Sequence, residues 1–190
     1  MNKKILILNG SPKKGGNTEI LAGWFAEGAR SAGAKAETVR TASLKYKVSG
    51  CTSCRKCQKI KEYVCVIKDD ARPVLRKMAA ADVIVFATPL YFYGPSAQLK
   101  VLIDRMFSLY KWDNATDTFE SPMRGKTMAL LLSAYEDVGL KNVEKMFRII
   151  ADYSEMKFVS LLVPDARESG DILKLKGVRE KAAALGKRLL

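Results

Sequence analysis

Four cysteines within a short stretch are the residues whose type and spacing could most directly perform chemistry. Cys51, Cys54, Cys57 and Cys65 follow the pattern Cys-x2-Cys-x2-Cys-x7-Cys. Three thiolates at intervals of three residues can bind one iron–sulfur cluster, as in bacterial ferredoxins, and a fourth can complete the ligand set. Four thiolates can also bind zinc, although zinc sites more often consist of two separated Cys-x2-Cys pairs. Four reduced thiols without a metal are a third interpretation.

Residues 10–18 form a second candidate site, because small and hydroxyl-bearing residues join an apolar run to a helical pattern. Their sequence is GSPKKGGNT, and residues 5–8 before them are ILIL. Backbone N–H groups and the dipole at a helix N-terminus attract phosphate, and Ser11, Asn17 and Thr18 add side-chain donors. Gly16-Asn17 stands where a Walker A loop requires Lys-Ser/Thr, and Pro12 replaces the second glycine of the dinucleotide fingerprint G-x-G-x-x-G. The segment therefore predicts a cradle for a phosphate monoester, with a plain glycine-rich turn as the alternative.

A third candidate site is the aromatic segment PLYFYGP over residues 89–95. Three neighbouring aromatic residues cannot all face one core, so at least one ring should be exposed. An exposed ring, or its backbone, can pack along a flat heterocycle. The alternative is that two rings fill the core and the third has no role.

Alternating strand and helix patterns supply the elements that would position these segments. Strands are predicted over residues 3–9, 36–41, 83–87, 128–133 and 158–163. Helices are predicted from an N-cap at Asn17 or Thr18 to Gly33, from a cap at Asp69 or Asp70 to about residue 80, around residues 99–107 and 143–150, and over 178–190.

This alternation predicts an α/β fold in which right-handed crossovers build a five-stranded parallel sheet covered on both faces. Pro89 is expected to end the third strand, since proline cannot donate to a central ladder. Residues 42–68 are expected to form an irregular functional loop. In the strand order 2-1-3-4-5, ligands bind beyond the carboxyl ends of the first and third strands, where the phosphate and aromatic segments begin.

Composition narrows the class of protein. The chain has 190 residues, a formal net charge of +13 and no histidine, which excludes Ser-His and Cys-His nucleophile pairs and histidine-ligated zinc. The length predicts one domain over residues 1–190. Neither a signal-peptide core nor a membrane span is visible, and the cysteines are clustered, so a cytoplasmic protein without a membrane partner is expected. No nucleic-acid-binding motif accompanies the positive charge, which indicates solvated surface or an anionic ligand.

Taken together, these segments resemble the NAD(P)H-dependent FMN reductase family of flavodoxin-like oxidoreductases. The stretches that match it, in order, are NGSPKKGGNT, CTSCRKC with CVIKDD, ADVIVFATPLYFYG and AQLKVLIDRMF, followed less specifically by LLLSA and VPDARESGDI. The resemblance implies a single flavodoxin-like FMN-binding domain, a three-layer sandwich with the strand order 2-1-3-4-5. It also implies FMN as cofactor, NAD(P)H as co-substrate and a homodimer with the flavins near its interface.

The resemblance further implies which residues bind FMN. Those expected at the phosphate are Ser11, Lys13, Gly16, Asn17 and Thr18; those expected along the isoalloxazine are Pro89, Leu90, Tyr91, Phe92, Tyr93 and Gly94; and those expected in a third loop are Ser133, Ala134 and Tyr135. No catalytic side chain is expected, because the flavin itself performs the chemistry.

Two functions follow from this resemblance. The first is a reductase that passes hydride from NAD(P)H through FMN to a small acceptor such as a quinone, a flavin, or a nitro or azo compound. The second is an iron–sulfur flavoprotein that carries electrons to or from a ferredoxin-like protein, with Cys51, Cys54, Cys57 and Cys65 as ligands of a [4Fe–4S] cluster. The six basic residues between residues 45 and 61 suit an acidic protein partner.

Overall fold

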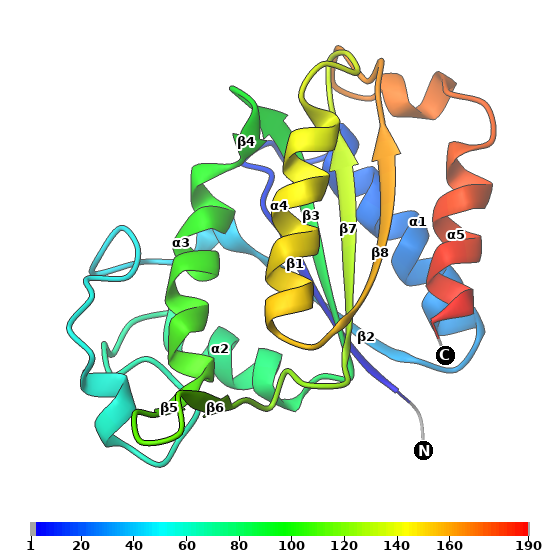
Figure 1. Ribbon diagram of the computed structural model, residues 1–190. Helices are drawn as coiled ribbons and strands as arrows, with labels where there is room; N and C mark the ends of the chain where they lie inside the picture. The colour runs from blue at the N-terminus through cyan, green and yellow to red at the C-terminus, as the bar shows by residue number, and fades with distance from the viewer. Residues whose placement is uncertain (1–2, 190) are drawn as a thin grey trace.

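A parallel sheet forms the centre of the molecule (Figure 1), and the computed structural model describes residues 3–189. Its strand order is β2-β1-β3-β7-β8, with every neighbouring pair parallel. The strands are β1 (Lys4–Asn9), β2 (Lys35–Arg40), β3 (Val83–Tyr91), β7 (Thr127–Ser133) and β8 (Lys157–Val163). This arrangement confirms the predicted α/β fold and, counted along these five strands, the order 2-1-3-4-5.

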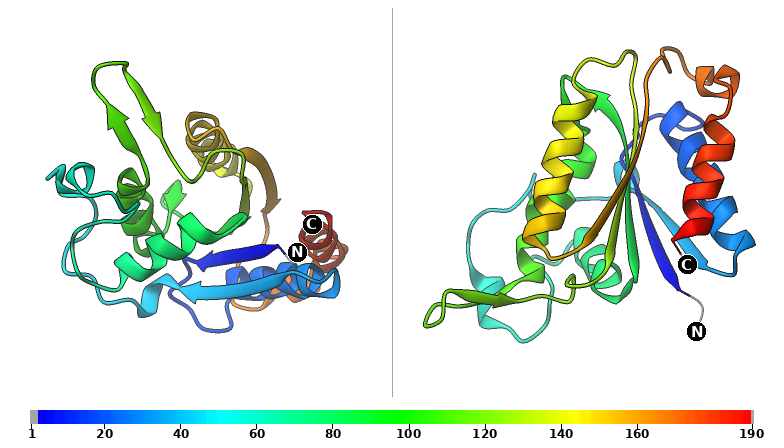
Figure 2. Two further views of the ribbon diagram at one scale, coloured as in Figure 1. Left: turned by 90° about the horizontal axis from the view of Figure 1, so that it is seen from below. Right: turned by 45° about the vertical axis from the view of Figure 1, so that its right-hand side comes forward.

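Helices cover both faces of the sheet, and the right-hand view of Figure 2 shows α4 on one side and α1 with α5 on the other. The helices are α1 (Asn17–Ser31), α2 (Ala71–Ala80), α3 (Ala97–Arg105), α4 (Leu140–Tyr153) and α5 (Val178–Arg188). Ile5, Ile7 and Val85 belong to the core beneath α1 and α5, whereas Leu6, Leu8 and Phe86 belong to the opposite core. Because successive strand residues point to opposite faces, a sheet buried on both sides requires the continuous apolar runs seen in the sequence.

The third strand is longer than predicted. β3 continues through Thr88 and Pro89 to Tyr91 and turns back into the two-residue strand β4 (Gly94–Pro95). β1 ends opposite Ala87, so Pro89 lies where β3 has only β7 beside it. Such a position tolerates proline because one side of the strand needs no ladder hydrogen bond. The prediction that Pro89 ends the strand was therefore wrong.

Helix ends also differ from the sequence pattern. The N-cap of α1 is Gly16, without a side-chain cap bond, rather than Asn17 or Thr18. The N-cap of α2 is Asp70, also without a side-chain cap bond, although Asp69 Oδ1 accepts from the N–H of Ala71 at 3.2 Å. α3 ends at Arg105, and the next residues form the 3-10 turn Met106–Leu109. The predicted end of the last helix at Leu190 lies outside the described residues.

One small sheet was not predicted. β5 (Lys111–Asp113) and β6 (Thr118–Glu120) form an antiparallel hairpin that projects away from the central sheet in the left-hand view of Figure 2. Its Trp112 and Phe119 rings lie 5.1 Å apart, and Phe119 stacks on Tyr153 of α4 at 5.2 Å. Aromatic contacts of this kind stabilise a hairpin too short to be stable alone.

Residues 42–68 are irregular as predicted, apart from the 3-10 turns at Thr41–Ser43 and Lys56–Lys59. The segment around Cys65 is not a strand. Trp24 is 9% exposed and packs in the core, and Lys100 pairs with Asp104 at 2.5 Å. Among the described helices, none is both long and apolar enough to cross a membrane.

The close contact between α1 and α5 generates a stability prediction. A Cβ added at Gly28 of α1 would lie 2.0 Å from the carbonyl oxygen of Ala183 in α5, whereas a Cβ at Gly23 would meet nothing within 4 Å. Gly28→Ala should therefore lower the free energy of unfolding by about 1–3 kcal/mol through overpacking. Gly23→Ala, on the exposed side of the same helix, should raise it by about 0.5–1 kcal/mol. Urea unfolding of both variants measures the difference, and equal effects would contradict the close contact.

Candidate functional site

A pocket of about 300 Å³ lies beyond the carboxyl ends of the strands, where the topology places ligands. Its wall consists of the carboxyl end of β3 and the loops that follow β1, β7 and β8. Of the residues predicted to bind a ligand, those in its wall are Ser11, Lys13, Gly16, Asn17, Thr18, Pro89, Leu90, Tyr91, Ser133, Ala134 and Tyr135. The volume is at the lower end of the range for small-molecule sites.

Hydrogen-bond donors and cationic side chains line one end of the pocket. Helix α1 begins there, and the first N–H groups of a helix have no intrahelical acceptor. The buried hydroxyls of Thr18 and Ser133 lie 2.8 Å apart, and the hydroxyl of Ser11 is 3.3 Å from both the N–H and the carbonyl oxygen of Lys13. Lys13 and Arg167 line the pocket, and none of its described lining residues is acidic. This end is suited to a dianion such as a phosphate monoester.

The loop after β1 leaves room for such an anion. A Cβ at Gly16 would lie 3.2 Å from Lys13 Cβ and 3.7 Å from Ser11 Oγ, so any side chain there would crowd the cradle. Asn9, the last residue of β1, accepts from the N–H of Ser11 at 3.0 Å through Oδ1. Its buried Nδ2 has no partner among the described residues.

Asn17 serves the site differently from its predicted role as a side-chain donor to phosphate. Its Nδ2 donates to the carbonyl oxygens of Ala166 and Glu168 at 2.9 and 2.8 Å. Its Oδ1 accepts from the N–H groups of Gly170 and Ile172 at 2.9 and 3.3 Å. The side chain therefore holds the loop after β8 against the start of α1. Of the donors of Asn17, only the backbone N–H remains available to an anion at the helix terminus.

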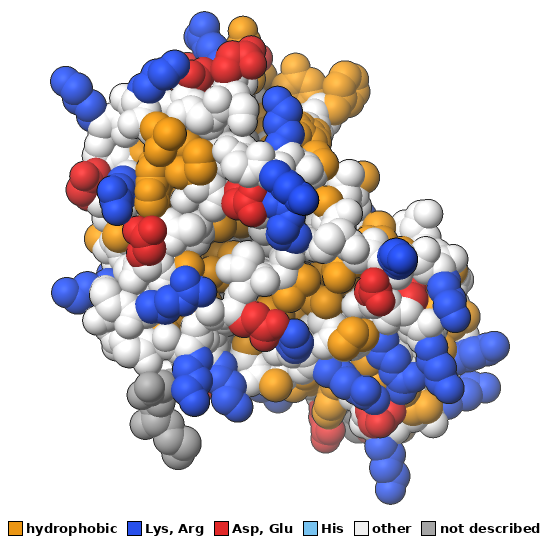
Figure 3. Space-filling model, turned by 180° about the vertical axis from the view of Figure 1, so that it is seen from behind, with side chains coloured by type: hydrophobic (Ala, Val, Ile, Leu, Met, Phe, Trp, Pro, Cys, Tyr) orange, Lys and Arg blue, Asp and Glu red, His pale blue; other side chains and the backbone are white. Residues whose placement is uncertain are grey.

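The aromatic segment lies at the mouth of the pocket. Tyr91 lines the pocket, whereas Phe92 and Tyr93 form the turn beyond it and Gly94 begins β4. Phe92 and Tyr93 have φ values of 43° and 63°, a left-handed conformation that bulky residues seldom adopt. Tyr91, Phe92 and Tyr93 are 45%, 99% and 55% exposed, which confirms that at least one ring is accessible. Figure 3 shows hydrophobic side chains gathered near the top of the molecule, where β4 lies.

All four cysteines line a second, small cavity beside the carboxyl end of α3. Cys57 is buried, Cys65 is half-buried, and Cys51 and Cys54 are exposed. The N–H of Lys56 lowers the pKa of the Cys54 thiol, whereas burial raises that of Cys57. Within residues 3–189, no three side chains of His, Cys, Asp or Glu are placed to hold one metal ion. This arrangement differs from a zinc site, in which four thiolates lie about 2.3 Å from one point.

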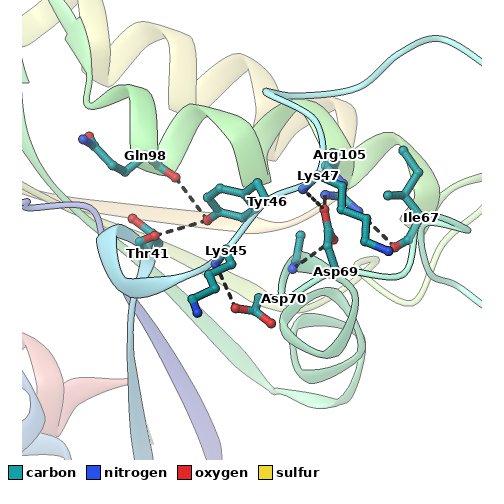
Figure 4. A network of polar contacts seen from close by, with 10 residues as sticks. Thr41, Lys45, Tyr46, Lys47, Ile67, Asp69, Asp70, Gln98 and Arg105 are labelled. Carbon is teal, nitrogen blue, oxygen red and sulfur yellow. Dashed lines mark hydrogen bonds and ion pairs between the residues drawn. The ribbon is translucent and has the colours of Figure 1, made fainter.

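A buried ion pair fixes the wall of this cavity (Figure 4). Arg105 Nη1 donates to Asp69 Oδ2 at 2.7 Å, and both side chains are 1% exposed. Asp69 Oδ2 also accepts from the N–H of Lys47 at 3.0 Å, and Arg105 Nη2 donates to the carbonyl oxygen of Ile67 at 3.3 Å. Burial would raise the pKa of Asp69, but the bonds from Arg105 and Lys47 outweigh it and lower that pKa. Asp70 adds a bond from the N–H of Lys45 at 2.8 Å.

Comparisons with known proteins agree with this geometry. The model of the family described as NADPH-dependent FMN reductase matches residues 3–165. The chain belongs to this family. A protein of Bacillus subtilis named as an NAD(P)H-dependent FMN-containing oxidoreductase is 26% identical over 187 residues, 97% of each chain. An iron-sulfur flavoprotein of Methanosarcina thermophila is 39% identical over 102 residues, which cover 54% of this chain and 51% of that protein.

Thus the chain spans about half the length of the archaeal iron-sulfur flavoproteins that it matches. Among solved structures, an azoreductase from Bacillus anthracis superposes with a TM-score of 0.74 at 15% identity, covering 99% of this chain and 100% of that one. An NAD(P)H:quinone oxidoreductase from Methanothermobacter marburgensis superposes with a TM-score of 0.71 at 15% identity, covering 99% and 97%. At such low identity these structures show the shared flavodoxin-like fold.

Three pocket residues were missed by the sequence analysis of this reductase-family chain. Ala166, Arg167 and Ser169 lie in the loop after β8 and complete the pocket wall. Arg167 lies over the Tyr135 ring at 5.1 Å and so links the third and fourth loops. The fifth strand also ends at the carboxyl edge of the sheet, and that was the signal available in the sequence.

The four bonds of the Asn17 side chain predict a local effect of its removal. In Asn17→Ala the amides of Gly170 and Ile172 lose their acceptor, so their hydrogen exchange should become about tenfold faster, since one hydrogen bond contributes about 1–1.5 kcal/mol. Exchange measured by NMR tests this. Asn142→Ala, which removes an exposed asparagine from the first turn of α4, should leave both amides unchanged. Unaltered exchange in Asn17→Ala would show that the side chain does not hold the loop.

Proposed function

We propose that this protein is an FMN-containing oxidoreductase that takes hydride from NAD(P)H and passes it to a small acceptor such as a quinone, a free flavin, or a nitro or azo compound. The observation that carries the proposal is a single pocket with a cationic, donor-rich end and an aromatic mouth. FMN, when bound, supplies the capacity to accept and release a hydride or single electrons. The family and the Bacillus subtilis relative support this choice of cofactor.

In this proposal the protein binds and orients the flavin and excludes water from it. The phosphate is held by Ser11, Lys13, Thr18 and the N–H groups that begin at Gly16 and Asn17, with Arg167 as a further cation. The residues along the isoalloxazine are Pro89, Leu90, Tyr91, Phe92, Tyr93 and Gly94, and Ser133, Ala134 and Tyr135 supply the third loop. No side chain is assigned a catalytic role.

A homodimer is part of the proposal, because the mouth of the pocket carries an exposed apolar surface. Tyr91, Phe92, Tyr93, Tyr135 and Val138 are all more than 40% exposed, and clustered apolar side chains of this size favour contact with another protein surface. The cytoplasm is the compartment we propose, since a reducing environment keeps four cysteines in the thiol form.

A second candidate function is electron transfer by an iron–sulfur flavoprotein, with a [4Fe–4S] cluster on Cys51, Cys54, Cys57 and Cys65. The observation that favours it is that all four side chains line one cavity although they are spread over an irregular segment. Lys and Arg side chains gather at the lower right of Figure 3, at the end of the molecule that carries this segment. Such a surface suits an acidic, ferredoxin-like partner.

Binding of FMN and riboflavin tests the phosphate site. Thr18→Val and Ser11→Ala each remove a buried hydroxyl that would donate to a charged oxygen, a bond of about 1.5–3 kcal/mol. We expect the Kd for FMN to rise about 10- to 150-fold and the Kd for riboflavin, which has no phosphate, to change less than about threefold. Quenching of flavin fluorescence measures both constants. Thr38→Val on the exposed part of β2 is the control, and equal losses for the two ligands would contradict a phosphate site.

Replacement of all four cysteines by serine separates the two candidate functions. A reductase should oxidise NAD(P)H with ping-pong kinetics, because both substrates use the same face of the flavin in turn, and should retain its rate within a few-fold. An electron carrier purified without oxygen should instead contain about four irons per chain, and Cys54→Ser should abolish electron transfer while FMN stays bound. Stoichiometric iron together with negligible NAD(P)H oxidation would overturn the first function in favour of the second.

A further inference from the structure

The cysteine cavity contains a buried cation with an unused donor. Arg105 lines the cavity together with the four cysteines, and its side chain is 1% exposed. Nη1 and Nη2 are engaged by Asp69 and by the carbonyl oxygen of Ile67. Nε is buried and has no partner among the described residues. The guanidinium therefore offers one N–H bond and part of its charge to whatever occupies the cavity.

A buried N–H donor without a partner lowers the stability of the fold, so an acceptor is expected beside Arg105 Nε. A buried N–H without a partner costs about 1–3 kcal/mol, and a buried charge costs more. The Cys65 thiol lines the same cavity as the Arg105 side chain. Sulfur is thus the acceptor that the cavity wall presents to this guanidinium.

The backbone turns sharply around Cys54. Ser53 and Arg55, on either side of Cys54, have φ values of 56° and 52°, so the segment turns sharply on both sides of that thiol. Each iron of a [4Fe–4S] cluster takes one thiolate, so the four sulfurs surround the cluster and need not meet at one point. Cys51 and Cys54 are exposed, so two of the four thiols are accessible from solvent.

We propose that Arg105 is a positioning residue of the cysteine site, whose Nε–H donates to a sulfur atom of a bound iron–sulfur cluster and whose charge raises the reduction potential of that cluster. This inference rests on the second candidate function. When one electron arrives from a reduced flavin or another one-electron donor, the cluster and its thiolates become more negative by one charge. A fixed cation beside them stabilises the reduced form more than the oxidised form.

Asp69 is the counterion that holds Arg105 in place and offsets part of its charge. Its Oδ2 is 2.7 Å from Arg105 Nη1 and leaves Nε without a partner among the described residues. Neutralising Asp69 leaves the cation less compensated, whereas neutralising Arg105 removes it. The two changes should therefore shift the potential in opposite directions, and a purely structural ion pair would not produce that pattern.

The experiment compares R105Q, R105K and D69N with wild type after anaerobic incubation with ferrous iron, sulfide and thiol. Iron and sulfide content, far-UV circular dichroism and FMN binding report integrity, and a potentiometric titration followed by visible absorbance and EPR reports the potential. We expect R105Q to lower the potential by at least 59 mV, a tenfold change in a one-electron equilibrium. R105K should remain near wild type, and D69N should lie above it.

Two further variants act as controls. R76Q removes the same charge from α2 at an arginine that is 56% exposed and pairs with Glu62 outside the cavity, so it should leave the potential unchanged. The double variant D69N/R105Q removes both buried charges together, which protects the fold if R105Q alone leaves Asp69 unpaired. It should also titrate below wild type.

The possible outcomes distinguish failure of the Arg105 proposal from failure of the electron-carrier function. If wild type binds a cluster and both R105Q and the double variant keep its potential, the role of Arg105 is overturned while the electron-carrier function stands. Loss of iron from every Arg105 variant, R105K included, would also overturn it in favour of a structural ion pair. If wild type takes up no iron and sulfide, the electron-carrier function and this inference fall together, and flavin binding is unaffected.

Discussion

Both faces of the central sheet must be covered by helices, and the positions of both sites follow from that constraint. The strands are parallel, so each connection crosses back over the sheet, and the carboxyl ends of β1, β3, β7 and β8 meet at one edge. Loops at that edge are free of the packing that fixes the strands. The end of β3 and the loops after β1, β7 and β8 converge on the pocket, because parallel strands place their carboxyl ends at the same edge.

Helix α3 connects the two sites. Its N-cap Ser96 accepts from the N–H of Leu99 and donates through Oγ to the carbonyl oxygen of Gly10 at 2.7 Å, beside the phosphate loop. Its last residue, Arg105, lies in the wall of the cysteine cavity. A Cβ at Gly10 would lie 2.7 Å from Ser96 Oγ, so the close approach at this end requires glycine. The two sites therefore lie at opposite ends of α3, and residues of this helix contact both of them.

Patterns within a short window were predictable from the sequence, and pairings between distant segments were not. The apolar runs of β1 and β3 and the loops after them follow from local periodicity and from the switch point. The hydrogen bonds of the Asn17 side chain are made to a loop about 150 residues later in the chain. Pro89 can lie within β3 because β1 ends before it and does not pair with it. The β5–β6 hairpin depends on Tyr153 of α4. None of these partners is visible in a local pattern.

Arg105 illustrates the same limit most clearly. In the sequence, Arg105 is a polar residue between the apolar positions Leu102 and Met106 of a helix. In the structure it is nevertheless among the most buried side chains of the fold. A buried ion pair is a weak source of stability, because desolvation offsets most of the attraction, and an apolar pair of equal size often stabilises as well. An apolar pair, however, could not bind the N–H of Lys47 and the carbonyl oxygen of Ile67. Those bonds join both ends of the cysteine segment to α3, so the ion pair positions that segment whatever it adds to stability.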